Sequence, residues 1–435
     1  MEERTRPRGR RWSGWLRLAT VELGPLRKHR DFRLLSVGQM VSFTGSMITY
    51  VAIPFQVYQL TRSSLLVGLL GVAELAPLLA TGLLGGALAD ARDRRRMVQL
   101  TELGLALLSA VLVANALAGR PRVWVLFVVA SLAAALDGLQ RPSLDALLPR
   151  LVPREEMAAA TALASLRMSL GMVGGPALGG LLVARFGLAA TYAVDVVSFG
   201  FSLALLRLMR AVPPPPDAGP PSLRGVVEGL RYARSRQELL GTYVVDVVAM
   251  VFGMPQALFP AIATRYGGAG VLGLLYAAPS VGALLANATS GWTGRVQRHG
   301  RAILVAAAVW GAAIAAFGLA GRLWLALALL GLAGAADMVS GIFRAVIWNQ
   351  TIPDHLRGRL AGIELLSYTT GPLLGNVEAG SVAALVGVRA SVVSGGLLSV
   401  VGVVLVALAM PLFRGYDARG LGGAAPRDRA EAGAP

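Results

Sequence analysis

Long apolar runs separated by short charged turns recur along the whole chain. Each run has about 20 residues or more, which is the length that a helix needs to cross roughly 30 Å of hydrocarbon. The runs predict twelve spans, at about 32–60, 65–89, 97–118, 123–146, 157–184, 188–209, 239–265, 271–294, 301–320, 323–348, 360–386 and 389–413. The pattern therefore predicts an all-α membrane protein with twelve transmembrane helices.

The composition agrees with a membrane protein and excludes several other classes. Only 15% of the 435 residues are charged and the mean hydropathy is +0.62, whereas a soluble protein has about 25% charged residues. The absence of cysteine excludes disulfides, thiol catalysis and cysteine-ligated metals. The three histidines lie in predicted loops, and the single lysine, Lys28, follows Arg27 and not a glycine, which excludes a Walker A loop. We expect no enzyme and neither a metal nor an organic cofactor.

Positive charge is divided unevenly between the two ends of the predicted spans. The net charge of +17 could indicate nucleic acid, but the positions of the charges matter more than their sum. Of the 41 lysines and arginines, the turns on one side hold only seven: Arg62, Arg120, Arg122, Arg185, Arg265, Arg322 and Arg389. By the positive-inside rule the other side is cytoplasmic. We expect a multi-pass membrane protein with both termini cytoplasmic and no nucleic-acid partner.

A proline-rich run at 211–221 separates the spans into two sets of six. The run cannot be helical, and a short amphipathic helix can follow it from Ser222 to about Gln237. The predicted parts are a basic cytoplasmic tail that lies on anionic lipid headgroups (1–31), a six-helix bundle (32–210), a cytoplasmic linker (211–238), a second six-helix bundle (239–413) and a disordered cytoplasmic tail (414–435).

The two sets of spans are related by an offset of 200 residues. The matched pairs include Arg122 and Arg322, Trp124 and Trp324, Asp137 and Asp337, and Pro153 and Pro353. Matches between alanines or leucines arise by chance in such a chain. Matches of Trp, Asp and Pro at the same offset are much rarer by chance and indicate a repeat. We therefore expect two pseudo-symmetric bundles with a substrate site near the midplane between them.

Three stretches on the predicted cytoplasmic side resemble a known family. The turn after the second span carries a glycine, an aspartate and a basic cluster, represented by Gly86, Leu88, Asp90, Arg94 and Arg95. Ala91 and Asp93 depart from the usual residues. With the segments 141–156 and 353–360, this turn resembles the major facilitator superfamily, and most of all its enterobactin-exporter and macrolide-efflux branch. The resemblance implies the major facilitator fold, with a cavity lined by spans 1, 4, 7 and 10, and a place in the bacterial cytoplasmic (inner) membrane.

The fifth span contains a cluster of small residues around a proline, namely Gly171, Gly175, Pro176, Gly179 and Gly180. The glycines let helices approach closely and the proline removes one backbone hydrogen bond, which makes a kink or pivot. Ordinary packing explains the same spacing. The spacing also resembles the antiporter signature of exporters, which favours export.

Ionisable residues inside the spans are the candidates for binding and coupling, because each is costly in hydrocarbon. Asp137 and Asp337 each lie about 14 residues from the outer end of their spans, or roughly 21 Å. We predict a pseudo-symmetric pair for proton coupling or for a cationic substrate group; the alternative is that neighbouring groups satisfy each one. Further candidates are Asp246, Gln39, and Glu74 paired with Arg167, a pair that also fits a structural role.

The charged turn at Gly86–Arg96 is expected to act as a cytoplasmic gate. When that side closes, Asp90 can meet the positive N-terminus of the eleventh span near Leu360. Arg94 can pair with Asp145 at the end of the fourth span. Each contact contributes about 1 kcal/mol at a wet surface, which is enough to bias a balanced equilibrium.

Taken with the resemblance, these observations predict a secondary active transporter, a proton-coupled exporter that works by alternating access. Its partners are a small amphipathic substrate (a siderophore, a macrolide-like compound or another drug or metabolite), protons and the lipid bilayer, and the pattern predicts no particular oligomeric state. A proton-coupled uptake symporter is the main alternative. A transport-like sensor and a membrane enzyme are further alternatives, although the spans contain no histidine or cysteine cluster for catalysis.

Overall fold

The computed structural model describes residues 22–91, 93–212, 231–353 and 357–417. Within these ranges, the side chains of 83–91 and 357–366 are not described. Most of the predicted N-terminal tail, of the proline-rich linker with its amphipathic helix, and of the C-terminal tail therefore lies outside the described residues.

The apolar runs of the first half form long helices. A short helix α2 (Gly24–Lys28) leads into α3 (Arg30–Thr61), α4 (Ser64–Ala91), α5 (Arg94–Leu117) and α6 (Val123–Leu151), and the 3₁₀ turn η2 (Arg154–Glu156) precedes α7 (Met157–Arg207). α7 contains two spans, whose arms meet at Gly187. The φ of Gly187 is 78°, a value that glycine adopts because it has no Cβ.

The second half repeats this arrangement with two interruptions. It contains α9 (Gln237–Gly253), η3 (Gln256–Leu258), α10 (Phe259–Tyr266), α11 (Ala269–Ala288), η4 (Ser290–Arg295), α12 (His299–Leu319), α13 (Leu323–Thr351), α14 (Arg357–Val386), α15 (Val388–Ala409) and the short α16 (Pro411–Arg414). The seventh span is broken between Gly253 and Gln256, where Pro255 keeps Met254 in extended backbone.

The described helices account for the twelve predicted spans. Ten are long and apolar enough to cross a membrane by length and composition. One of the ten holds both arms of α7, and α14, with 30 residues, supplies the remaining span. The all-α prediction with twelve spans is therefore confirmed for this multi-pass membrane protein.

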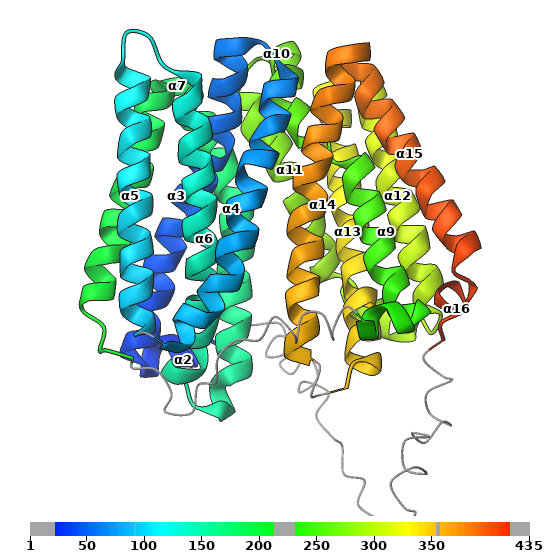
Figure 1. Cartoon of the computed structure of the whole chain (residues 1–435), viewed down its shortest axis with the longest axis horizontal. Helices are drawn as coiled ribbons and strands as arrows, with labels where there is room; N and C mark the ends of the chain where they lie inside the picture. The colour runs from blue at the N-terminus through cyan, green and yellow to red at the C-terminus, as the bar shows by residue number, and fades with distance from the viewer. Residues whose placement is uncertain (1–21, 92, 213–230, 354–356, 418–435) are drawn as a thin grey trace, which may run out of the picture.

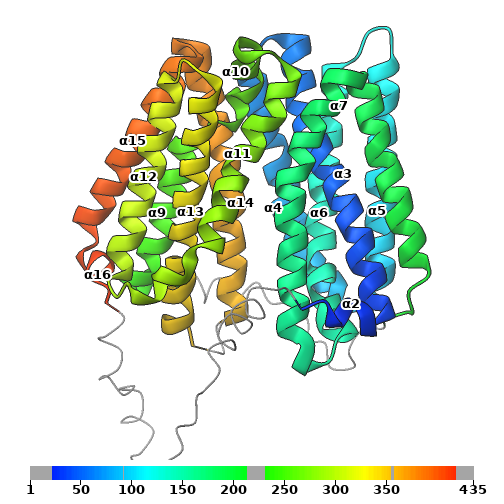
Figure 2. The same ribbon diagram turned by 180° about the vertical axis from the view of Figure 1, so that it is seen from behind.

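The helices stand side by side in two groups, α3–α7 and α9–α15 (Figures 1 and 2). The short helices α2 and α16 lie at the same end of the molecule (Figure 1), which we call the tail end; the opposite end is the far end. Contacts between the groups join α4 to α14 and α7 to α11. They occur where Gly71 lies against Leu373 and Gly180 lies against Gly273, toward the far end of these helices.

A hydrogen bond and two aromatic rings add to this contact between the groups. The hydroxyl of Tyr50 in α3 donates to the side-chain oxygen of Gln256 in η3 at 2.7 Å. The ring of Tyr50 also meets the ring of Tyr276 in α11 edge to face, with the centroids 5.7 Å apart. The far end is therefore closed by direct contacts between the two groups.

Candidate functional site

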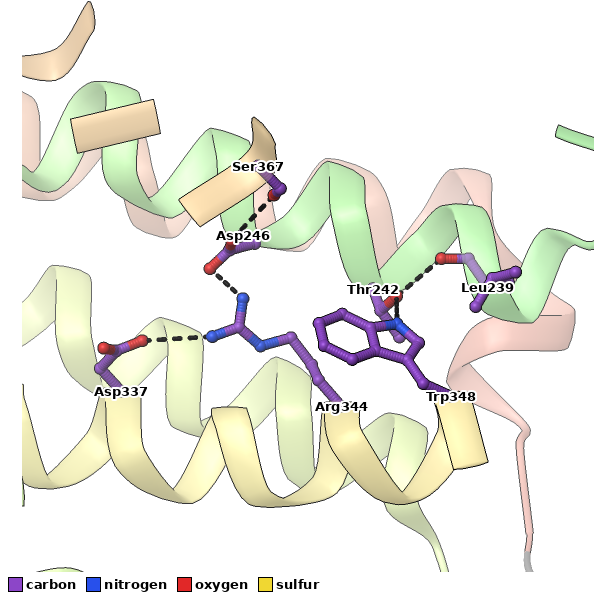
Figure 3. A network of polar contacts seen from close by, with 7 residues as sticks. All are labelled: Leu239, Thr242, Asp246, Asp337, Arg344, Trp348 and Ser367. Carbon is purple, nitrogen blue, oxygen red and sulfur yellow. Dashed lines mark hydrogen bonds and ion pairs between the residues drawn. The ribbon is translucent and has the colours of Figure 1, made fainter. Parts of the chain in front are cut away.

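A buried arginine lies between two carboxylates in the second helix group (Figure 3). Asp337 and Arg344 are seven residues apart on α13, which is about two turns, so they share one helix face. Because helical side chains lean toward the N-terminus, Arg344 reaches back, and its Nη2 lies 3.4 Å from Oδ1 of Asp337. Its Nη1 forms an ion pair with Oδ1 of Asp246 on α9.

The pairing of α9 with α13 sets this geometry. One turn below Asp246 on α9, the hydroxyl of Thr242 accepts a hydrogen bond of 2.8 Å from the indole nitrogen of Trp348, which is one turn beyond Arg344 on α13. The two helices thus run antiparallel with two polar contacts in register (Figure 3). The register holds the guanidinium where both acids can reach it.

The two carboxylates differ in their surroundings. The side chain of Asp246 is 4% exposed, and its Oδ2 accepts a hydrogen bond of 3.0 Å from the hydroxyl of Ser367 on α14. The side chain of Asp337 is 41% exposed. Arg344 is 3% exposed and also lies over the ring of Tyr368, 5.4 Å from its centroid, at cation–π distance. Asp246 is therefore the fixed partner of the arginine and Asp337 the accessible one.

The cluster lines a cavity of about 330 Å³ that both helix groups border. Ser169 and Met172 of α7 contribute from the first group. From the second group come the three charged residues and, among others, Met250, Met254, Trp310 and Tyr368. The cavity is thus mainly apolar, with its charge concentrated at one place.

The other predicted acids lie apart from this cluster. Asp137 is exposed on α6, one turn before Arg141, whose charge acts on it; it is not among the described residues that line the cavity. Glu74 on α4 has the phenols of Tyr50 and Tyr276 within electrostatic reach. The cavity lining thus includes Asp337 but not Asp137, although the repeat relates them.

The predicted contact of Arg167 with Glu74 is not the one that the structure shows. Arg167 on α7 interacts electrostatically with Asp145 on α6, and Arg141 acts on the same carboxyl. Arg94 donates to the backbone oxygen of Ala146 at 3.2 Å. These contacts tie α5, α6 and α7 together within one group.

The remaining parts of the predicted gate are only partly within the described residues. Arg95 donates to the backbone oxygen of Met209 at the end of α7. The surroundings of Gly86 and the side chains of Asp90 and Leu360 are not described. The gate therefore remains a prediction.

A second polar cluster in the first group includes Gln39, which is buried and does not line the cavity. Its amide donates to Oε1 of Glu102 on α5 at 2.6 Å, and the hydroxyls of Ser42 and Ser202 donate to the same oxygen at 3.2 and 2.9 Å. Glu102 is fully buried. Gln39 is thus part of the packing of α3, α5 and α7.

A similar arrangement surrounds Asp195 on α7, which is 1% exposed. Its Oδ2 accepts hydrogen bonds from Thr49 on α3 at 2.7 Å and from Ser109 on α5 at 2.8 Å. Both buried acids therefore bind the same three helices to one another through hydroxyl and amide donors.

The glycines of the fifth span lie at helix–helix contacts. A Cβ on Gly171 or Gly175 would collide with Phe43 or Met47 of α3. At the next turn, Gly179 faces the backbone of Ile48 in α3 and Gly180 faces Gly273 in α11. The cluster around Pro176 therefore lets α7 pack closely against α3 of its own group and against α11 of the other group.

Sequence reasoning missed Arg344 and Glu102. Arg344 lies inside the predicted tenth span, and its place two turns after Asp337 is a usable signal. The donors to Glu102 come from positions 39, 42 and 202, and no local pattern joins them.

Known transporters resemble the chain over most of its length. The enterobactin exporter EntS of Shigella boydii serotype 4 is 28% identical over 404 residues, which are 91% of this chain and 95% of the exporter. The enterobactin exporter EntS of Citrobacter koseri is 28% identical over 392 residues, which are 89% of this chain and 94% of that protein.

Solved transporter structures and the sequence profile of a family also match this chain. The nucleoside transporter NupG matches with a TM-score of 0.73 at 10% identity, over 88% of this chain and 99% of that one. A bacterial homologue of the iron transporter ferroportin, in an inward-facing state, matches with a TM-score of 0.66 at 17% identity, over 88% and 98%. These likenesses show the major facilitator fold. The sequence profile of the transmembrane secretion effectors matches residues 20–421, and the chain belongs to this family of major facilitator transporters.

Proposed function

We propose that this transporter is a proton-coupled exporter of a small amphipathic molecule and works by alternating access. The observation that carries the proposal is that one guanidinium, Arg344, serves two carboxylates on the wall of a cavity that both groups border. With both acids ionised the cluster has one negative charge in excess, which is costly among membrane helices. A proton or a cationic group of the substrate can each remove that excess.

Asp337 is the better exchange site of the two acids. Asp246 is almost fully enclosed and holds Arg344 together with Ser367, whereas Asp337 is 41% exposed and lies 3.4 Å from the guanidinium. A proton on Asp337 leaves Arg344 paired with Asp246 alone. Loss of that proton frees a carboxylate for a cationic group of the substrate. Because proton and substrate compete for one carboxylate, binding of one favours release of the other, as antiport requires.

The cavity supports a substrate that is mainly apolar with a polar or cationic part. Met250, Met254 and Trp310 form much of its wall, and methionine side chains adapt to irregular ligands. Its volume of about 330 Å³ is near the lower end of the range for ligand pockets. A siderophore, a macrolide-like compound or another drug or metabolite would therefore fill the cavity only after it widens.

Three observations support export across the bacterial inner membrane. The similar enterobactin exporters are named for export, and the glycine cluster of α7 resembles the antiporter signature. The positive-inside rule assigns the tail end to the cytoplasm, and the far end is closed by contacts such as Tyr50 with Gln256. A chain closed toward the outside is ready to load from the cytoplasm.

Everted membrane vesicles test coupling and direction together. Vesicles are energised to an acidic interior, and a catecholate siderophore, a macrolide and a cationic dye are added in turn while internal pH and accumulation are followed. We expect at least one compound to accumulate and to discharge the pH gradient. Asp337→Asn should abolish the discharge at a normal protein level, whereas Asp137→Asn, outside the cavity, should retain it.

Other outcomes would overturn parts of the proposal. Accumulation only in right-side-out vesicles would indicate an uptake symporter. Binding of a compound without movement in either type of vesicle would indicate a sensor. Proton-driven accumulation that is unchanged in Asp337→Asn would remove Asp337 from the coupling step.

A further inference from the structure

A second and larger hollow lies on the opposite face of the helix pair that borders the central cavity. It has a volume of about 800 Å³ and runs along α11 and α13, between residues such as Leu274, Val281 and Leu285 on one helix and Leu332 and Val339 on the other. The central cavity is lined by the intervening positions of the same helices, including Pro279, Ala283, Gly334 and Met338. The groove therefore faces away from the transport path, toward lipid.

The groove exists because small residues bring the two helices together without filling the space beside them. Gly282 lies directly against the backbone of Gly331, and Gly334 lies against the backbone of Pro279. Ala278, Ala286, Ala328 and Ala335 continue the floor. The large side chains stand at the rims, where Leu285 is 62% and Leu332 is 49% exposed.

At the tail end the groove finishes at an aromatic residue beside arginines. Trp292 in η4 lines the groove, is 44% exposed, and meets Phe343 of α13 edge to face at 6.2 Å. A 3₁₀ helix has three residues per turn, so residues at i and i+3 project from the same side. Arg295 therefore projects on the side of Trp292, and the exposed Arg298 and Arg301 follow closely.

The part of the chain that carries these arginines has no acid of its own. The chain contains no Asp or Glu between Asp246 and Asp337, a stretch that covers α11, η4 and α12. Among the ion pairs of the described residues, none includes Arg295, Arg298 or Arg301. The apolar groove thus ends beside a tryptophan and arginines that form no ion pair with another described residue, and tryptophan is typical of the level of lipid headgroups.

We propose that the groove binds an anionic phospholipid, with an acyl chain between α11 and α13 and its phosphate beside Arg295. The acyl chain fits the apolar floor and is common to all phospholipids. Basic pockets next to transmembrane helices select anionic headgroups, so the arginines provide the preference. This site is independent of the substrate cavity and of the direction of transport.

Native mass spectrometry of the purified full chain tests the site. The protein in detergent is given equal amounts of dioleoyl phosphatidylglycerol and dioleoyl phosphatidylcholine, and bound lipids are counted. We expect phosphatidylglycerol to be preferred and Arg295→Gln to reduce the preference about fivefold, since one arginine near the surface contributes about 1 kcal/mol. Arg207→Gln, at an exposed arginine that ends α7 in the first helix group, is the matched control and should leave the preference intact.

Filling the groove tests the place of the acyl chain. Ala335→Phe, and separately Leu332→Trp at an exposed position, should reduce binding of both lipids, whereas Ala312→Phe on the exposed face of α12 should not. Tm values measured without lipid identify any variant that does not fold. If one of the two groove-filling variants fails to fold, lipid binding by the other tests the proposal. Equal binding of the two lipids by the wild type, or unchanged binding in a folded groove-filled variant, would overturn the proposal.

Discussion

The guanidinium of Arg344 holds together two carboxylates that would otherwise repel each other. Replacing it, as in Arg344→Gln, leaves Asp246 buried without its ion pair. Breaking a buried pair by removing one partner costs about 3–5 kcal/mol. We therefore expect a clear fall in Tm, measured in detergent by fluorescence-detected gel filtration after heating.

The double variant Asp246→Asn/Arg344→Gln separates charge imbalance from lost packing. It removes both members of the ion pair, and amides can still accept from Ser367. We expect it to recover at least half of the Tm lost in Arg344→Gln. A double variant that is less stable than either single variant would show that packing around Arg344, and not its charge, dominates.

Part of this cluster could be predicted from the sequence. Asp246 and Asp337 stand out because carboxylates are rare in apolar spans. Arg344 does not, because it lies four residues before the predicted end of the tenth span at 348, where arginine is common on the cytoplasmic side. In the structure α13 continues to Thr351 and the arginine is enclosed. The repeat was also misleading here, since Arg344 corresponds to Leu144 and the charge pair exists in one half only.

At the scale of helices, the contact of α3, α5 and α7 depends on a carboxyl group that accepts three hydrogen bonds. Glu102→Gln retains an oxygen in that position for Gln39, Ser42 and Ser202 and buries no ionised group. Glu102→Ala leaves those donors without their acceptor, at about 1–3 kcal/mol for an unsatisfied buried group. We expect Glu102→Gln to keep a Tm near that of the wild type and Glu102→Ala to lower it.

The comparison of these two variants also tells which form of the carboxyl group the helices require. If Glu102→Gln loses as much stability as Glu102→Ala, the negative charge itself is needed and the hydrogen bonds alone do not explain the contact. Measurements of Tm at two protein concentrations exclude an effect of aggregation.

Helix boundaries show what hydropathy can and cannot predict. Hydropathy locates the spans because about 20 apolar residues must cross the bilayer whatever their neighbours are. It does not locate the helix ends, since local backbone preferences determine where each helix stops. The predicted eighth span reaches 294, but α11 ends at Ala288 and Ser290–Arg295 form a 3₁₀ turn rich in glycine and hydroxyl residues.

For the molecule as a whole, the two helix groups differ in the role of their buried polar residues. In the first group the buried acids, Glu102 and Asp195, are enclosed by hydroxyl and amide donors and hold helices together. In the second group the acids share an arginine on the cavity wall. In the proposed mechanism, the first group moves as one body against the second, which carries the exchanging charge.

Closure of the far end depends on the close approach of Gly180 in α7 to Gly273 in α11. A Cβ at Gly180 would stand 2.6 Å from the nitrogen and 2.7 Å from the Cα of Gly273. These are backbone atoms, which cannot move aside as the end of a flexible side chain can. Gly180→Ala should therefore separate the groups at this end and favour the conformation open to the outside. Gly174→Ala on the same helix meets nothing within 4 Å and is the matched control.

The cysteine-free chain makes this shift measurable without background labelling. Leu373→Cys places one thiol where α14 meets Gly71 of α4, and a membrane-impermeant maleimide added from outside reports its exposure. Labelling should be faster in the Gly180→Ala background than in the wild-type or Gly174→Ala background, because separated groups admit the reagent. Equal rates in all three would mean that the glycine contact does not hold the far end closed, and that the contact of Tyr50 with Gln256 and Tyr276 is sufficient for closure.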